Sequence, residues 1–465
     1  MTRSHDSAVL RRSIETTGYS DVQKLAAKLD LPALHRCAPQ RYPFLLQSTA
    51  SASSLAGFDI LFACPGESLV LETIGCLNGP DASGGFLTSL DEWWQRESTD
   101  KVPSALPFYG GWFLYLGYEL AAEIEPGLEL DDDPVLPTAF AVRCAAAVIR
   151  DKDSGECFLV VEKDAEFDTA QLRTDIAASK QNDHGADGDL VQARINEEPA
   201  DEFTAAVRRA KQFISAGDVY QANLSREWSA KADKTLAASQ IYASLSQSNP
   251  APFAGIVRWK GATIISSSPE RLVRIREGVI STRPIAGTRP RSDDQDVDDS
   301  LSAELLSHPK ELAEHVMLID LERNDLGRVC VPGTVEVDEM MVLESYAHVH
   351  HIASNIRGVL RDDVTPGDAI RAVFPGGTIT GCPKVRCMEI IQQLEKGPRG
   401  AYTGSFGYLN RDGSLDLNIL IRTMVLRDGE LSFRTGSGIV ADSEPDAELA
   451  ETRAKAEGLL RALRL

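Results

Sequence analysis

Residues 263–282 read TIISSSPERLVRIREGVIST, and the order of apolar and turn-forming residues in this stretch decides the class of fold. The apolar and β-branched runs are interrupted at Ser268-Pro269 and at Glu277-Gly278, where a chain readily turns. The stretch therefore predicts successive β-strands around two turns, with no helix between them.

Other strand-like runs alternate with helical patterns, but without a steady βαβ rhythm. In residues 219–228, VYQANLSREW, apolar and polar residues alternate, which places Gln221 on the polar face of a strand. The preceding residues are apolar at helical spacing, with Asp201 as the candidate N-cap and Gly217 as the stop. Strands clustered between helices favour an α+β fold with antiparallel sheets.

The sharpest change of composition lies at residues 181–199, which are polar and rich in Gly and Asp. Such a segment predicts a linker, here between an N-terminal region, 1–180, and a C-terminal region, 200–465. Three segments of the N-terminal region predict buried β-structure: 58–63, the aromatic strand pair 107–120, and 139–149.

Charge and composition exclude several classes of protein. The 465 residues include 69 acidic and 48 basic side chains, a formal charge of −21, so nucleic acid is not an expected partner. An anionic ligand would need arginines or a metal close to it. The eight cysteines show no CxxC or zinc-type spacing and indicate reduced thiols. Without a signal-like or membrane-length apolar run, we expect a cytoplasmic protein with no membrane partner.

Two predicted helices each carry glutamates three residues apart: Glu311 with Glu314, and Glu448 with Glu451. Residues at this spacing share a helix face. Oxygen-only clusters suit a hard cation such as Mg²⁺, which binds a few carboxylates together with an anionic substrate. The alternative is two solvated acidic faces, which are common in an acidic chain, and the pattern alone leaves both open.

The first of these helices is predicted over residues 308–328. Pro309 suits its first turn, and Leu312, Val316 and Ile319 form a stripe of apolar residues. The stripe predicts the face that packs against the core.

Glycines and histidines supply further candidates. Gly436 and Gly438 allow a ligand to approach the backbone just before a helix N-terminus, which favours anions. A second glycine-rich loop occupies residues 374–384. Residues 345–354 contain three histidines, and in a strand His351 would face away from the other two.

Nine segments occur in the following order: SSSPERL, RPIAGTRPR, KELAEHVMLIDLERNDLGR, YAHVHHIAS, FPGGTITGCPKVRCMEIIQQLE, RGAYTGSFGYL, LNILIRT, GSGIV and ELAET. Together they resemble the chorismate-utilising enzymes, in particular the large subunits of anthranilate synthase and aminodeoxychorismate synthase. The match covers most of residues 200–460, and PFLLQS and PFYGGW extend it weakly toward the N-terminus. The resemblance implies two large antiparallel sheets packed as a sandwich with surrounding helices, and Mg²⁺-dependent chemistry on chorismate.

The resemblance also implies residue roles. Glu270 matches the general acid that protonates the departing C4 hydroxyl, and His351 and Thr378 match residues beside that leaving group. Tyr402 and Arg422 match positions that hold the enolpyruvyl carboxylate, with the backbone at Gly438. The metal carboxylates correspond to Glu311, Glu314, Glu448 and Glu451.

The nucleophile follows from Gln221, because relatives that add water at C2 have a lysine in this position. An amide is a poor general base, so an already nucleophilic amine, ammonia, is the natural alternative. The G-x-C-x-G nucleophile motif of class I amidotransferases is absent from the chain. A separate glutamine amidotransferase subunit is therefore the expected source of ammonia.

Two alternatives differ in the product that is formed. Ala286 lies where many aminodeoxychorismate synthases have a lysine nucleophile and anthranilate synthases have alanine. Four other features favour the aminodeoxychorismate branch: FPGGTITG, Asn223, Asn418 and FDILFA. We therefore expect 4-amino-4-deoxychorismate, a precursor of 4-aminobenzoate and folate, formed through non-covalent 2-amino-2-deoxyisochorismate. The alternative is anthranilate, for tryptophan. A non-catalytic amino-acid sensor is disfavoured because the set of matched residues is intact.

Overall fold

The computed structural model describes residues 19–25, 28–50, 57–101, 104–181, 195–231, 237–292, 294–346 and 349–463. Most of the predicted linker 181–199 lies outside these ranges, so the boundary between an N-terminal and a C-terminal region stays a prediction. Within the described residues, no helix is long and apolar enough to cross a membrane.

The strands form one antiparallel hydrogen-bonded network, arranged as two sheets that share the long strands β3 (Phe58–Thr73) and β6 (Ala139–Asp151). The first sheet continues from β6 through β7 (Cys157–Glu162) to β1 (Ser20–Leu25). On the side of β3 it runs through β2 (Phe44–Gln47), β10 (Phe253–Trp259), β11 (Ala262–Ser268), β20 (Thr423–Arg427), β21 (Glu430–Ile439) and β9 (Gln221–Lys231), which also pairs with β8 (Ile195–Glu197) and β17 (Gly381–Cys382).

The second sheet begins at the other ends of β3 and β6. It runs through β5 (Gly111–Leu116), β18 (Ser405–Asn410), β19 (Leu415–Asn418), β12 (Arg271–Arg276), β13 (Val279–Arg283) and β16 (Val349–Val359), with β14 (Ile285–Pro290) and β15 (Glu336–Ser345) on β16 and β4 (Cys76–Asn78) on β3. A register shift between Pro65 and Ser68 of β3 marks the point where the two sheets diverge.

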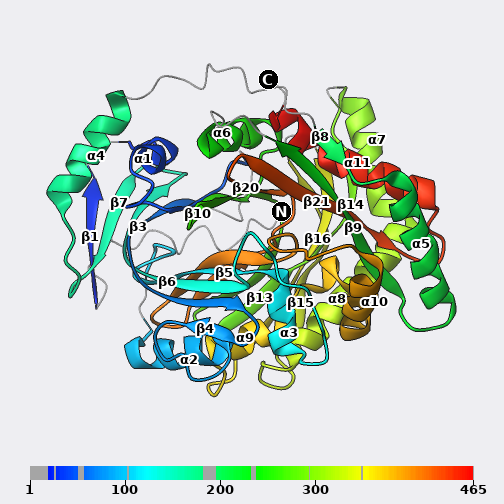
Figure 1. Cartoon of the computed structure of the whole chain (residues 1–465), viewed down its shortest axis with the longest axis horizontal. Helices are drawn as coiled ribbons and strands as arrows, with labels where there is room; N and C mark the ends of the chain where they lie inside the picture. The colour runs from blue at the N-terminus through cyan, green and yellow to red at the C-terminus, as the bar shows by residue number, and fades with distance from the viewer. Residues whose placement is uncertain are drawn as a thin grey trace, which may run out of the picture.

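Helices cover both outer faces of these sheets, as Figure 1 shows for α6 and α11 on one side and α2 and α9 on the other. The helices are α1 (Leu31–Cys37), α2 (Phe86–Glu97), α3 (Ala121–Ile124), α4 (Thr169–Gln181), α5 (Ala200–Ser215), α6 (Ala238–Ser248), α7 (Gln295–Ser307), α8 (Pro309–Gly327), α9 (Pro366–Val373), α10 (Lys384–Leu394) and α11 (Pro445–Leu463), with 3-10 turns η2 (Tyr118–Leu120) and η3 (Gly377–Ile379).

A core rich in aromatic residues fills the space between the sheets. It joins Phe44 and Ile264 of the first sheet to Phe113 and Phe406 of the second. Phe44 stacks on Phe113 with ring centroids 4.2 Å apart. Two further cores pack the helices against the outer faces. The predicted α+β fold with antiparallel sheets and surrounding helices is confirmed.

The stretch 263–282 forms β11, β12 and β13, as predicted, but the Ser268-Pro269 turn does not make a hairpin. β11 belongs to the first sheet and β12 to the second, so residues 268–271 carry the chain from one sheet to the other. The segment 419–422, between β19 and β20, makes the opposite crossing. The Ser268 hydroxyl donates to the Ile419 carbonyl, and the Ile419 N–H donates to the Glu270 carbonyl at 3.0 Å. The two crossings therefore lie side by side.

Local predictions need three corrections. The aromatic segment 107–120 forms one strand, β5, because its partners are β6 and β18 rather than a second strand of its own. Helix α5 begins at Ala200 with Pro199 as its N-cap, so Asp201 lies in the first turn. In α8, Val316 is 42% exposed, because the buried face carries the polar residues His315 and Glu322 beside Ile319.

The core between the sheets generates a stability prediction. Phe113 is completely buried and touches aromatic rings of both sheets. Replacing it with Ala removes these contacts and leaves a cavity, so we expect Phe113→Ala to lower the free energy of unfolding by about 3 to 5 kcal/mol in equilibrium urea denaturation. Ile74→Ala, at a side chain that is 46% exposed, serves as the control. Equal losses in the two variants would contradict this account of the core.

Candidate active site

The first crossing places a carboxyl group inside the protein. Glu270 is 4% exposed, and its Oε1 accepts a hydrogen bond from the Thr378 hydroxyl at 2.8 Å. Burial raises the pKa of Glu270 to about 7, although this hydrogen bond, the Ile285 N–H and the charges of Lys455 and Arg422 oppose the rise. A carboxyl group with this pKa can donate a proton near neutral pH.

A neutral histidine lies in the same region. The Nδ1 atom of His351 on β16 is 3.2 Å from the Gly287 carbonyl and 2.9 Å from the Thr288 hydroxyl. Since a carbonyl can only accept, the proton belongs on Nδ1 and leaves Nε2 as an acceptor. Nε2 is buried without a hydrogen-bond partner. Burial and the positive charges of Arg422 and Lys455 lower the pKa of His351 to about 3, which keeps the ring neutral.

Strands β9 and β21 form a second wall, on which two glycines make room for larger side chains. A Cβ on Gly438 would lie 2.2 Å from Nε2 of Gln221, and a Cβ on Gly436 would lie 2.7 Å from the Tyr402 hydroxyl. Gln221 Oε1 and Asn223 Oδ1 are buried and have no hydrogen-bond partner. Buried polar groups normally have partners, so these atoms mark a place where a polar ligand fits.

Two cations lie near Glu270 and His351. Arg422, in the second crossing, has a positive φ of 52° and donates to Asn249 Oδ1 at 3.4 Å. Lys455 on α11 donates to the Gly436 carbonyl at 3.0 Å and to Glu451 at 2.7 Å. The arginine was predicted from the sequence, whereas Lys455 was missed. Its position one helical turn after Glu451 was the available signal.

Ala286 lies on β14 opposite Ile352, the neighbour of His351. The preceding residue, Ile285, donates its N–H to Glu270. Strand β14, which carries Ala286, therefore contacts the Glu270 carboxyl group through Ile285 and pairs with the strand that carries His351. Of the other predicted histidines, His348 lies outside the described residues, and His350 binds Ser345 and Asp298 away from Glu270.

The four glutamates predicted to hold a metal lie on two sides of this region. Glu311, in the first turn of α8, accepts from Arg289 at 3.3 Å. Glu448, in the first turn of α11, accepts from the Ser437 hydroxyl between the two glycines of β21, and Glu451 follows one turn later. In the described ranges, no three His, Cys, Asp or Glu side chains converge as a metal site, so the predicted cluster is not gathered.

The physical reason is that carboxylates repel one another. Glu311 accepts instead from Arg289, and Glu448 accepts from the Ser437 hydroxyl. Their donor set still fits Mg²⁺, since all donors are carboxylate oxygens and Glu311 and Glu448 approach β14 and β21, the strands that carry Ala286 and Gly438.

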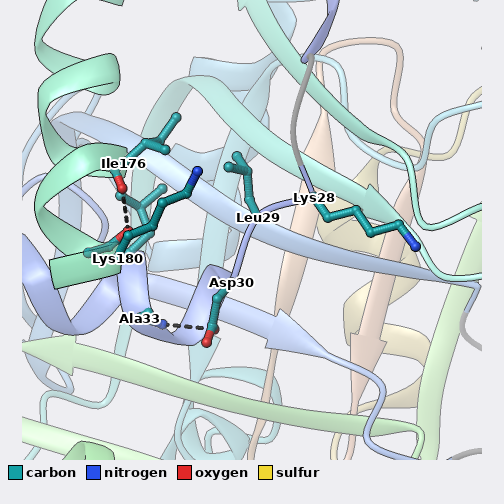
Figure 2. Close-up of a pocket in the computed structure, with 8 residues that line it drawn as sticks. Lys28, Leu29, Asp30, Ala33, Ile176 and Lys180 are labelled. Carbon is teal, nitrogen blue, oxygen red and sulfur yellow. Dashed lines mark hydrogen bonds between the residues drawn. The ribbon is translucent and has the colours of Figure 1, made fainter. Parts of the chain in front are cut away.

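Two cavities lie elsewhere among the described residues. One of about 110 Å³ lies between α1 and α4 (Figure 2), where Asp30 is already occupied in capping Ala33 at 3.0 Å, and it offers no catalytic constellation. The other, of about 190 Å³, borders Tyr402 on the side of the buried Arg399 and Arg434. The residues around Glu270 therefore remain the candidate site.

The chain is similar to proteins of one family. The family model described as chorismate binding enzyme matches residues 79–461. The anthranilate synthase component I-like protein of Synechocystis sp. is 45% identical over 78% of this chain and 75% of its own length. Anthranilate synthase component 1 of the same organism is 37% identical over 92% of each chain. The crystal structure of anthranilate synthase component I from Streptococcus pneumoniae matches with a TM-score of 0.76 at 30% identity, covering 88% of this chain and 93% of that one.

Proposed function

The chain belongs to the chorismate binding enzymes, and from this premise we propose that it aminates chorismate at C2 with ammonia. Ammonia forms a C–N bond at C2, the ring double bonds shift, and the C4 hydroxyl leaves as water with the proton of Glu270. The ammonium group formed at C2 then loses a proton, which gives 2-amino-2-deoxyisochorismate. The observation that carries the proposal is a buried carboxyl group with a pKa of about 7, bonded to Thr378 in a region with two cations.

Ammonia is favoured over water as the nucleophile because Gln221 is an amide. Gln221 begins β9, and its side chain lies over Gly438. An amide cannot remove a proton from water, whereas ammonia needs no such activation. His351 is neutral and presents Nε2 as an acceptor, which suits a residue beside the hydroxyl that leaves.

The substrate is a dianion, and this region supplies the charges to hold it. Arg422 can bind a carboxylate through two parallel hydrogen bonds, with the Tyr402 hydroxyl and the backbone at Gly438 as further donors. Lys455 adds a second positive charge next to Gly436. In a protein of net charge −21, these two cations offset part of the repulsion that an anion would meet.

Enzymes of this family generally use Mg²⁺, and Glu311, Glu314, Glu448 and Glu451 are the residues proposed to hold it. When bound, it would neutralise a carboxylate of the substrate as a Lewis acid. The relatives are named as one component of anthranilate synthase, which agrees with ammonia arriving from a separate glutamine amidotransferase subunit.

The names of the relatives favour anthranilate as the product, which was the alternative at the level of sequence. None of the relatives named above is an aminodeoxychorismate synthase. Anthranilate forms when the C2 proton and pyruvate are lost from the common intermediate. We take it as the first candidate.

One observation favours the second candidate, 4-amino-4-deoxychorismate. Synechocystis has an anthranilate synthase component 1 and a separate component I-like protein, and this chain is 37% identical to the former over 92% of its length and 45% identical to the latter over 78% of its length. A second branch beside anthranilate synthase agrees with the four sequence features that favour amination at C4. This product forms when a second ammonia adds at C4 of the common intermediate, the ring double bonds shift back, and the amine at C2 leaves as ammonia.

The products that the purified chain forms test both the amination and the choice between the two candidate products. With chorismate, Mg²⁺ and ¹⁵N-ammonium, we expect a product that carries ¹⁵N, identified by mass spectrometry. Unlabelled isochorismate as the main product would contradict amination. Anthranilate would support the first candidate, whereas 4-aminobenzoate, appearing only after an aminodeoxychorismate lyase is added, would replace it with the second.

The role of Glu270 predicts a specific pH dependence. Because the protonated form is the active one, kcat should fall as the pH rises through about 7. Glu270→Gln should lower kcat by about 100-fold or more while chorismate still binds in a calorimetric titration. Thr378→Val removes a donor that favours the ionised carboxyl, so it should move the fall in kcat to higher pH. Near wild-type turnover of Glu270→Gln would refute the assignment.

The carboxylates predict a requirement for metal. An excess of chelator should stop turnover, and added Mg²⁺ should restore it, with an unchanged circular dichroism spectrum as the control for folding. Glu448→Gln should raise the Mg²⁺ concentration needed for half-maximal rate, because one of the proposed ligands loses its charge. Turnover that persists in chelator would remove these glutamates from the proposal.

A further inference from the structure

A buried arginine joins two walls of the candidate site. The side chain of Arg399 is 2% exposed, and the carboxylate of Glu395, which is 3% exposed, accepts from its Nε at 3.0 Å. Nη2 of Arg399 donates to the Asn223 carbonyl of β9 at 2.7 Å, and Nη1 donates to the Ile379 carbonyl of η3 at 3.2 Å. One guanidinium group therefore connects strand β9 to the turn that carries Thr378.

All five N–H groups of this guanidinium donate within the protein. Besides the three bonds above, Nη2 donates to Oε1 of Glu395, and Nη1 donates to the Thr403 hydroxyl at 3.4 Å. An arginine has five N–H donors in a fixed, planar arrangement, so none is left for a ligand. Its positive charge is paired with Glu395. Arg399 is thus placed to hold other groups of the protein rather than to bind substrate.

Two tyrosine rings lie against the same guanidinium. Its central carbon is 5.6 Å from the ring centroid of Tyr402 and 4.9 Å from that of Tyr118, distances at which a cation is attracted to an aromatic face. Tyr402 closes a turn with Arg399, donating its N–H to the Arg399 carbonyl at 3.0 Å. Oε1 of the buried Glu119 accepts from the N–H groups of Arg399 and Gly400 at 2.8 and 3.0 Å. The turn that carries the arginine and Tyr402 is therefore itself fixed.

The position of the Tyr402 hydroxyl depends on this arrangement. The place that a Cβ would take on Gly436 is 2.7 Å from this hydroxyl and 2.8 Å from Oδ1 of Asn223. Tyr402 also borders the cavity of about 190 Å³, so packed side chains do not fully enclose its ring. Arg399 contacts the ring and at the same time binds the Asn223 carbonyl of β9. The hydroxyl is thereby held close to the strand pair β9 and β21.

Stability alone gives a poor account of the buried pair of Arg399 and Glu395. Removing two charges from water is costly, and a buried ion pair often contributes no more stability than apolar residues of the same volume. The bonds of this pair reach β9, η3 and the ring of Tyr402, which all border one site. Placement of groups in that site explains these contacts better.

We propose that Arg399 is a positioning residue that fixes the Tyr402 hydroxyl against strand β9, where it binds a carboxylate of chorismate. Arg399 acts on substrate binding rather than on proton transfer, because the turn of Thr378 has a second attachment. The Asn223 N–H donates to the Thr380 carbonyl at 2.9 Å and does not involve the arginine. The inference rests on the proposed function, since it assumes that the Tyr402 hydroxyl donates to the substrate.

The test separates KM from kcat in Arg399→Lys, which keeps a positive charge beside Glu395 but cannot bind both carbonyl groups. We expect the KM for chorismate to rise about tenfold and kcat to stay within about twofold of wild type, because a hydrogen bond to substrate is weakened. The Kd of chorismate in a calorimetric titration should rise by the same factor. A purely structural role would lower the amount of folded enzyme, and hence kcat, at an unchanged KM. That result would overturn the inference.

A double-mutant cycle tests whether the effect acts through Tyr402. Tyr402→Phe should also raise KM about tenfold, because it removes the hydroxyl. Arg399→Lys combined with Tyr402→Phe should have a KM within about twofold of Tyr402→Phe alone, since the hydroxyl that the arginine positions is already absent. Independent effects would multiply to about 100-fold, and such a value would overturn the inference.

Arg226→Lys is the matched control. Arg226 is a second buried arginine, on the same strand as Asn223, with its guanidinium carbon 5.0 Å from the ring centroid of Trp228 and a bond to Glu197 at 2.6 Å. Neither partner belongs to the candidate site, so we expect an unchanged KM. An equal rise in KM in this variant would show a general effect of buried arginines and would overturn the inference.

A second variant covers the case in which Arg399→Lys does not fold. Glu395→Gln leaves the arginine in place but weakens two of its five hydrogen bonds. We expect KM to rise in this variant as well, by a smaller factor, with kcat again within about twofold of wild type. An unchanged KM in folded Glu395→Gln would overturn the role of Arg399.

The inference and the proposed function can fail separately. KM and Kd refer to chorismate, whichever nucleophile adds at C2. Wild-type enzyme that forms isochorismate would refute the amination and leave the comparison of KM values readable. Wild-type enzyme that aminates chorismate, with a raised KM in Tyr402→Phe and an unchanged KM in Arg399→Lys, would overturn the role of Arg399 alone.

Discussion

The arrangement of the site depends on two chain crossings that hydrogen-bond to each other. The chain passes from the first sheet to the second at residues 268–271 and returns at 419–422, and the strands on each side of both crossings are paired. Backbone bonds join the crossings: Ile419 N–H to the Glu270 carbonyl at 3.0 Å, and Ser267 N–H to the Arg422 carbonyl at 3.1 Å. An acid on one crossing is thereby fixed beside a cation on the other. Loss of either strand pairing would separate them.

Burial then sets the charge states that the chemistry needs. Desolvation is the largest cause that favours the protonated form of Glu270 and the neutral form of His351, and the charges of Arg422 and Lys455 add to it for His351. Arg422 and Lys455 add positive charges nearby, and Lys455 also pairs with Glu451 at 2.7 Å. These two cations favour an anion locally within a protein whose overall charge repels one.

The sequence could predict local features but not the partners of each strand. SPERL was correctly predicted to end a strand, yet a turn motif cannot tell a hairpin from a crossing, since β11 pairs with β20, more than 150 residues away. Strand alternation correctly separated His351 from His350. The stripe through Val316 was wrong because apolar spacing cannot detect a helix face that buries His315 and Glu322. The roles of Glu270 and Arg422 came from resemblance and stay proposals, which the burial of Glu270 and the nearby charge of Arg422 support.

Two of the residues that favoured one product over the other, Asn418 and Asn223, lie in different surroundings. Asn418, one of the features that favoured aminodeoxychorismate, binds the Phe406 N–H at 3.0 Å and the Phe253 carbonyl at 3.2 Å, so it braces strands rather than facing substrate. Asn223 differs, because its Oδ1 is buried, unpartnered and next to Gly436. Both products share the step at C2 and diverge only in what happens to the intermediate. A change in a few polar atoms in this region would leave the fold unaltered, so overall identity to anthranilate synthases does not by itself select the product.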